Sequence, residues 1–207
     1  MSYWGRILPH WLGRGAADVL AGRVVVVGIT GGVAAHYLPE LIGQLRFRHM
    51  AIVHAAMTAA AEHFVSPLTV ATACEAPVWH SVFDTAERAP LAHIHWARQA
   101  DLVLVAPATF DFIGKVASGI ADDPVSLLLA ATTAPVLLAP SMHATMWANP
   151  ILRRNVATLE GVGYRIVPPE TGLQASGEVG EGRMAGIGTI LSALSELSET
   201  LPDKQKG

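Results

Sequence analysis

The chain has 207 residues and a formal net charge of −3, and 51% of its residues are hydrophobic while 15% are charged. This length suits one domain, and such a composition can bury a sizeable core and leave some apolar surface for subunit contacts. The charge balance shows no excess of basic residues for binding nucleic acid, and no apolar run reaches the roughly 18 residues of a membrane span. The single cysteine, Cys74, excludes an internal disulfide framework and favours a reducing cytoplasm.

Residues 1–22 contain Arg6, Arg14 and two tryptophans, but no unbroken apolar segment. We therefore interpret them as an N-terminal extension ahead of the domain and not as a signal peptide. At the other end, residues 201–207 are polar and are expected to form a frayed tail.

The apolar runs predict strands that alternate with helices. Residues 23–28 form a continuous apolar run that ends in glycine, which is typical of a strand buried on both faces. A helix is expected after it, from 33 to about 47. Further strands are expected over 50–54, 101–106, 135–139 and 164–167, and further helices over 93–99, 113–118, 124–132, 150–160 and 187–199. This alternation predicts an α/β fold, with a parallel sheet between two layers of helices.

Two stretches give weaker signals. Residues 65–90 are expected to be partly irregular. Residues 168–186 are rich in glycine and predict a long loop, and loops of this length inside a compact domain are usually functional or disordered.

Three loops that follow predicted strands carry the candidate site. The first, residues 28–33 (GITGGV), suits a phosphate, or serves close packing of a strand and a helix. It is not a GxGxxG fingerprint, and no acidic residue ends the second strand, which disfavours a dinucleotide. The second, residues 107–111 (PATFD), is expected in the same crevice, or is an ordinary turn in which Thr109 caps a helix. The third, residues 140–147 (PSMHATMW), suits a hydrophobic wall for a planar ligand, or a plug in a core or an interface.

His93 and His95 precede a helical stretch and invite comparison with a metal-binding pair. Ligands two residues apart suit a strand rather than a helix, and no third ligand is evident nearby in the sequence. We therefore expect no metal site.

Together the three loops resemble the homo-oligomeric flavin-containing cysteine decarboxylases. This family includes the phosphopantothenoylcysteine decarboxylases of coenzyme A synthesis and the epidermin-type peptidyl-cysteine decarboxylases. The resemblance runs from about Arg23 to Gly186 and is most specific in the segments LAHIHWARQADLVLVAPAT, GIADDP and APSMHATMWANP. It implies a flavodoxin-like (Rossmann-like) three-layer sandwich over residues 23–200, a substrate clamp at about 168–186, FMN as the cofactor, and assembly into trimers or dodecamers with FMN at the subunit interface.

The resemblance also implies roles for single residues. His93 falls on the family's active-site histidine, whereas His95 does not, and Thr58 is expected near the FMN phosphate. The other expected FMN contacts are Gly28, Thr30, Gly31, Gly32, Val33, Phe64, Pro107, Ala108, Thr109, Asp122, Ser141 and Met142. The expected substrate contacts are Asp111, His143, Met146, Ser176 and Met184.

The mechanism that the resemblance implies begins at the thiol of a cysteine. A histidine can accept a proton near neutral pH, so His93 would take the thiol proton while FMN takes a hydride from the β-carbon. The thioaldehyde that results lets carbon dioxide leave and an enethiolate form. The flavin carries the redox chemistry, and the protein supplies position and proton transfer.

Four positions depart from the family pattern, and one of them is Phe112, where the family has a threonine. Ser176 stands where the coenzyme A enzymes carry an acidic cysteine, and a hydroxyl is a far poorer acid than a thiol, so we expect the saturating half-reaction to be lost and FMN to be reoxidised by oxygen. His143 and Asp111 each replace an asparagine of the family. These changes favour a peptide substrate: oxidative decarboxylation of the C-terminal cysteine of a ribosomally made peptide to an aminoenethiol, on the way to an aminovinyl-cysteine ring.

Three alternatives remain beside the peptide hypothesis. The first is the phosphopantothenoylcysteine decarboxylase of coenzyme A biosynthesis. The second is a non-catalytic, flavin-binding regulatory subunit, against which the presence of His93 argues. The third is a flavin prenyltransferase of the same fold, against which the segment SMHATMW argues.

Overall fold

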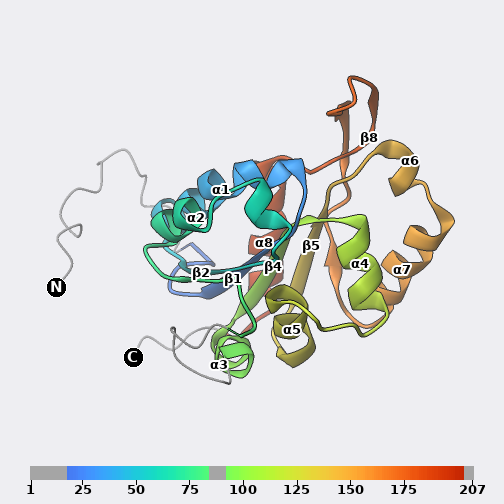
Figure 1. Cartoon of the computed structure of the whole chain (residues 1–207). Coiled ribbons are helices and arrows are strands. Elements are labelled where there is room, and N and C mark those ends of the chain that lie inside the picture. Colours follow the sequence, from blue (N-terminus) through green and yellow to red (C-terminus); the bar gives the residue numbers. More distant parts are fainter. Residues whose placement is uncertain (1–17, 84–91, 203–207) are drawn as a thin grey trace.

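The architecture is a parallel sheet between two layers of helices (Figure 1). A computed structural model describes residues 18–83 and 92–202. The 6-stranded sheet has the order β3-β2-β1-β4-β5-β6, and each neighbouring pair in it is parallel. Its strands are β1 (Val24–Ile29), β2 (Ile52–Met57), β3 (Val78–Trp79), β4 (Leu102–Ala108), β5 (Val136–Pro140) and β6 (Arg165–Ile166). The strand order reverses beside β1, so a crevice is expected beyond the carboxyl ends of β1 and β4.

The two helical layers bury two separate apolar clusters. On one face lie η1 (Val33–Tyr37), α1 (Leu38–Phe47), α2 (Pro67–Cys74) and α8 (Ile187–Glu199). On the other face lie α3 (Ala92–Gln99), α4 (Phe110–Ala117), α5 (Pro124–Ala131) and α7 (Pro150–Gly161). The predicted α/β sandwich is therefore confirmed.

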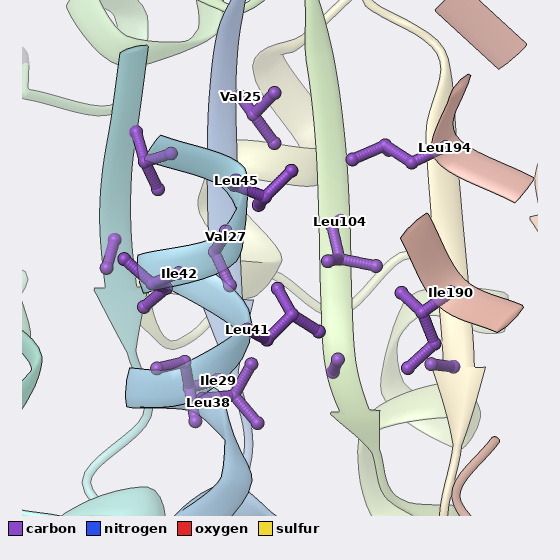
Figure 2. Close-up of a cluster of buried hydrophobic side chains, with 14 of the residues drawn as sticks. Val25, Val27, Ile29, Leu38, Leu41, Ile42, Leu45, Leu104, Ile190 and Leu194 are labelled. Carbon is purple, nitrogen blue, oxygen red and sulfur yellow. The ribbon is translucent and has the colours of Figure 1, made fainter. Parts of the chain in front are cut away.

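The first cluster shows why the apolar runs become central strands. Alternate residues of β1 point to opposite faces, so Val25 and Val27 face α1 whereas Val26 faces the second helical layer. Figure 2 shows Val25 and Val27 beside Leu45 of α1, and Leu104 of β4 facing α8. All seven residues of β4 are buried, which is the reason for its unbroken apolar sequence.

The glycine-rich stretch 168–186 is not simply a loop. It contains β7 (Glu170–Leu173) and β8 (Val179–Arg183), which pair antiparallel and project beyond the sheet next to α6 (Ala144–Trp147) (Figure 1). In the turn, the N–H of Gly177 donates to the carbonyl of Gln174 over 2.9 Å, and Gly177 has a φ of +86°. The loop prediction was wrong for these strands, because glycine and charged residues hide the alternation that identifies a strand.

The stretch 65–90 also contains more regular structure than expected. Helix α2 begins at Pro67 after the N-cap Ser66, and β3 adds an edge strand to the sheet. A short helix, η2 (Ala61–His63), precedes α2, and the part of this stretch over 84–90 lies outside the described residues.

Cys74 closes α2 and is a free, buried thiol. Burial raises the pKa of this thiol to about 12, against the smaller opposing effect of the nearby Arg46 charge.

In the described residues, no helix is long and apolar enough to cross a membrane. The boundary at residue 22 stays a prediction, and the side chain of Leu20 is fully buried in the first cluster.

Candidate functional site

A cavity of about 1040 Å³ lies at the carboxyl ends of β1, β2, β4 and β5. Each of these strands contributes the loop that follows it, and the β7–β8 hairpin with residues 184–187 adds a further wall. The volume lies just above the range of about 300–1,000 Å³ that is typical of small-molecule and cofactor sites. The cavity is therefore large enough to hold both a cofactor and a substrate.

The glycine loop after β1 forms one wall. Gly31 packs so closely against the next loop that a Cβ at this position would lie 2.4 Å from the Cβ of Ala60. Within the described part of the chain, the backbone N–H groups of Gly31, Val33 and Ala34 have no hydrogen-bond acceptor. Free amides on a loop in which Gly31 leaves no room for a side chain suit the phosphate of a flavin nucleotide, so these residues fit FMN.

Thr30 connects the glycine loop to the loop after β4. Its side chain is buried, and its Oγ1 donates to the carbonyl of Pro107 over 2.6 Å. The N–H of Thr109 donates to the same Oγ1 over 3.2 Å. Thr109 also caps α4, where its Oγ1 accepts from the N–H of Phe112 over 3.3 Å, which confirms the N-cap interpretation. The first and second loops are thus held in a fixed relation.

His143, in the loop after β5, is held on both sides of its ring. It is the N-cap of α6, and its Nδ1 accepts from the N–H of Thr145 over 3.3 Å. Since Nδ1 is an acceptor here, the hydrogen-bond network assigns the proton to Nε2, which lies 2.8 Å from Oε2 of Glu178. His143 therefore links the loop after β5 to the turn of the hairpin.

The hairpin also lies against this loop through its backbone. The N–H of Met142 donates to the carbonyl of Gly182 over 2.9 Å, and a Cβ at Gly182 would lie 2.2 Å from the carbonyl oxygen of Met142. The amide of Ala144 donates to Oε1 of Gln174 over 3.3 Å. Glycine at position 182 is thus required for the hairpin to approach α6.

Lys115 and two carboxylates lie at another edge of the site. The Nζ of Lys115 is 3.1 Å from Oδ1 of Asp122 and 3.9 Å from Oδ2 of Asp111. The hydrogen bond to Asp122 raises the pKa of the Lys115 ammonium, and burial opposes this shift. The side chain of Asp111 is 81% exposed, so this ion pair contributes little to stability.

The structure brings most of the predicted site residues to the cavity. The predicted residues that line it are Thr30, Gly31, Gly32, Val33, Thr58, Thr109, Asp111, Ser141, Met142, His143, Met146, Ser176 and Met184. These side chains and backbone groups come from segments far apart in the sequence, so the crevice expected beyond the strand ends is present.

Six predicted residues lie outside the cavity wall: Gly28, Phe64, Pro107, Ala108, Asp122 and His93. Gly28 makes room for Val125, since a Cβ there would lie 2.5 Å from its Cγ1. His93 is half-buried on α3, and in Figure 1 this helix and the β7–β8 hairpin lie on opposite sides of the molecule.

Several lining residues were not identified from the sequence. They are His36, Tyr37, Glu40, Lys115, Asp123, Gln174 and Arg183. Most of them lie one helical turn or more beyond a strand end, so a motif at the strand end does not include them. In the described residues, no group of three or more His, Cys, Asp or Glu is placed to hold a metal ion.

Comparison with protein families and with curated proteins gives consistent matches. The model of the family described as Flavoprotein matches residues 17–199. The chain is 42% identical over 172 residues to the coenzyme A biosynthesis bifunctional protein CoaBC of Escherichia coli K12, which covers 83% of this chain and 42% of that protein. It is 39% identical over 166 residues to CoaBC of Bacillus subtilis 168, covering 80% of this chain and 41% of that protein. The chain thus spans less than half the length of these curated relatives.

Solved structures support the same relationship. A cysteine-to-serine mutant of PPC decarboxylase, complexed with pantothenoylaminoethenethiol, has a TM-score of 0.76 and 28% identity, covering 86% of this chain and 100% of that one. The FMN-dependent cysteine decarboxylase SpaF has a TM-score of 0.74 and 29% identity, covering 87% of this chain and 97% of that one. With the sheet order, the free amides of the glycine loop and the matched residues 17–199 considered together, this chain belongs to the Flavoprotein family.

Proposed function

We propose that this protein is an FMN-dependent decarboxylase that acts on phosphopantothenoylcysteine in coenzyme A biosynthesis. The observation that carries the proposal is the similarity to the CoaBC proteins, which reaches 44% identity over 165 residues for Vibrio cholerae. The family match over residues 17–199 contains every residue that lines the cavity, from Thr30 to Ile187. The predicted cofactor, FMN, and the predicted enzyme class, a cysteine decarboxylase, are confirmed by the family and its structural neighbours.

The prediction of a peptide substrate was wrong. The curated relatives at 39–44% identity are CoaBC proteins. The peptide hypothesis depended on Ser176, His143 and Asp111. In the structure Ser176 is on an exposed turn, His143 is engaged by Thr145 and Glu178, and Asp111 is mostly exposed. Substitutions at these three positions carry less weight for the substrate class than the similarity to CoaBC, which covers four fifths of the chain.

The cavity walls divide into a polar and an apolar part. The free amides of Gly31, Val33 and Ala34 would hold the FMN phosphate, with Thr58 on the adjacent loop. Met142 and Met146, from the loop after β5, supply an apolar surface for a planar ring. FMN, when bound, would supply the redox chemistry: it would take a hydride from the cysteine β-carbon, which makes the loss of carbon dioxide possible, and would return it to the enethiol so that carbon dioxide is the only net loss.

Proton transfer is the part of the reaction for which the protein itself must supply a base. We assign this role to His93, because an imidazole is a side chain that can accept a thiol proton near neutral pH. His93 does not line the cavity of its own chain. The proposal therefore includes a homo-oligomer in which the α3 helix of one copy brings His93 to the cavity of another.

Turnover of two substrates by the purified protein with FMN tests this function. Phosphopantothenoylcysteine should lose one carbon dioxide in a mass spectrum, and a His93→Asn variant with normal FMN content should not support this loss. A peptide that ends in cysteine serves as the comparison substrate. Decarboxylation of the peptide alone, with phosphopantothenoylcysteine left intact, would contradict the proposal.

A further inference from the structure

We propose that Arg183 binds the phosphate group of the substrate and so distinguishes phosphorylated from unphosphorylated pantothenoylcysteine. This inference rests on the function proposed above. Arg183 is the last residue of β8 and lines the cavity. The residues that follow it, Met184 and Ala185, are buried in the first apolar cluster, so the position of Arg183 on the cavity wall is fixed from one side.

The stem of the Arg183 side chain lies across the partner strand of the hairpin. A Cβ at Gly172 would lie 3.0 Å from Cδ of Arg183 and 3.4 Å from its Nη1. Glycine at position 172 thus leaves the space that the arginine stem occupies. Arg183 is exposed, and its stem lies against the backbone of Gly172 on the partner strand.

Among the described residues, the guanidinium of Arg183 has no acidic partner. Within the part of the chain that the structure describes, Arg183 forms no hydrogen bond or ion pair through its side chain. The residue opposite it in the hairpin, Glu170, has its Oε1 occupied by the N–H of Gly186 at 2.9 Å and the hydroxyl of Thr189 at 3.2 Å.

The other permanently charged cation of the cavity wall is already neutralised. Lys115 is hydrogen-bonded to Asp122 and lies near Asp111. A guanidinium remains protonated at any physiological pH and presents a planar fork that matches a phosphate in two hydrogen bonds. Among the described cavity residues, Arg183 is therefore the cation that is available for an anionic group of a ligand.

The chemistry of the reaction indicates which anionic group this is. The carboxylate of the cysteine loses its charge when carbon dioxide leaves, so an arginine bound to it would stabilise the ground state more than the transition state and slow the reaction. The substrate phosphate keeps its charge throughout. The phosphate of FMN has the free amides of the glycine loop, which lie on a different wall from the hairpin.

The test compares phosphopantothenoylcysteine with pantothenoylcysteine as substrates for the FMN-loaded protein. A hydrogen bond to a charged group implies that wild-type kcat/KM is about tenfold to a hundredfold higher for the phosphorylated substrate, mainly through KM. In an Arg183→Gln variant this ratio should fall to near one. An Arg165→Gln variant, which alters an exposed arginine of β6 outside the cavity, is the matched control and should keep the ratio.

Bound FMN, measured from the flavin absorbance after gel filtration, gives a readout independent of turnover. Normal FMN content in Arg183→Gln, together with the lost ratio, supports the inference. Loss of FMN from this variant, or an unchanged ratio, overturns it. Equal turnover of both substrates by the wild-type protein overturns the inference but leaves the proposed function standing. Turnover of neither substrate by the wild-type protein overturns the proposed function, and the inference with it.

Discussion

Glycine residues of the loop after β1 have different structural roles although they are close together in the sequence. Gly28 lies within β1 and gives its space to Val125 of α5 on the second face of the sheet. Gly31 gives its space to Ala60 and leaves its own N–H free toward the cavity. Gly28 is therefore a packing residue, and Gly31 shapes the cavity wall.

The role of Gly28 predicts that it tolerates no side chain. Replacing Gly28 by Ala places a methyl group 2.5 Å from Cγ1 of Val125, a β-branched side chain with little freedom to move. We expect a loss of about 1–3 kcal/mol in the free energy of unfolding, measured by urea denaturation.

Gly43 provides the matched control for that substitution. It lies inside α1, and a Cβ there would meet nothing within 4 Å. Gly43→Ala is expected to stabilise the protein by about 0.5–1 kcal/mol, since alanine is the better helix former. Equal effects of the two substitutions would contradict the packing role of Gly28.

The β7–β8 hairpin is the element that sequence reasoning described least well, and it is the element that bears most directly on the site. Its turn is held to the loop after β5 by the contact between His143 and Glu178. The side chains of His143 and Glu178 are 33% and 71% exposed, so water weakens this contact. We therefore infer that the contact biases the hairpin toward the cavity and does not lock it there.

A double-mutant cycle measures this bias. Glu178→Gln and His143→Asn each remove the charged contact, while asparagine keeps the ability to cap α6. Because the contact is shared, the two single changes should not add, with a coupling of about 0.2–1 kcal/mol in the free energy of opening the hairpin. Hydrogen exchange of the amides over 174–178 reports that opening.

The control for the cycle is Glu181→Gln on the same hairpin. Glu181 is exposed and forms no ion pair with the described residues, so its replacement should leave the exchange of residues 174–178 as it is in the wild type. Full additivity of Glu178→Gln and His143→Asn would show that their contact does not hold the hairpin.

The strands of the main sheet and those of the hairpin differed in how well the sequence predicted them. The central strands β1, β4 and β5 are buried on both faces and were predicted to within two residues at each end, because burial requires an unbroken apolar run. The hairpin β7–β8 was missed, because its stability comes from backbone pairing and close approach at glycine. The sequence at the ends of the central strands therefore identified the loops of the site. The β7–β8 hairpin, which forms the opposite wall, could be recognised only in the structure.

At the scale of the whole molecule, His93, the base that we propose for the reaction, is not among the described residues that line the cavity of its own chain. The cavity is formed by the carboxyl ends of the strands and the hairpin. His93 belongs to α3, and Figure 1 shows this helix on the opposite side of the molecule from the hairpin. Large apolar side chains such as Val33, Tyr37 and Met146 are exposed next to the cavity. A ring of copies would cover such side chains and bring His93 of one copy to the cavity of the next.

Complementation between two inactive variants tests this arrangement. The first is His93→Asn, which keeps the cavity. The second is Gly31→Val, which fills the space at the glycine loop next to Ala60 and should abolish FMN binding. When the variants are co-expressed in equal amounts, half of the cavities and half of the histidines are intact. Sites that combine the two intact parts from different chains should restore about a quarter of wild-type activity. If His93 instead served the cavity of its own chain, every site would carry one damaged part, and the mixture would stay as inactive as each variant alone.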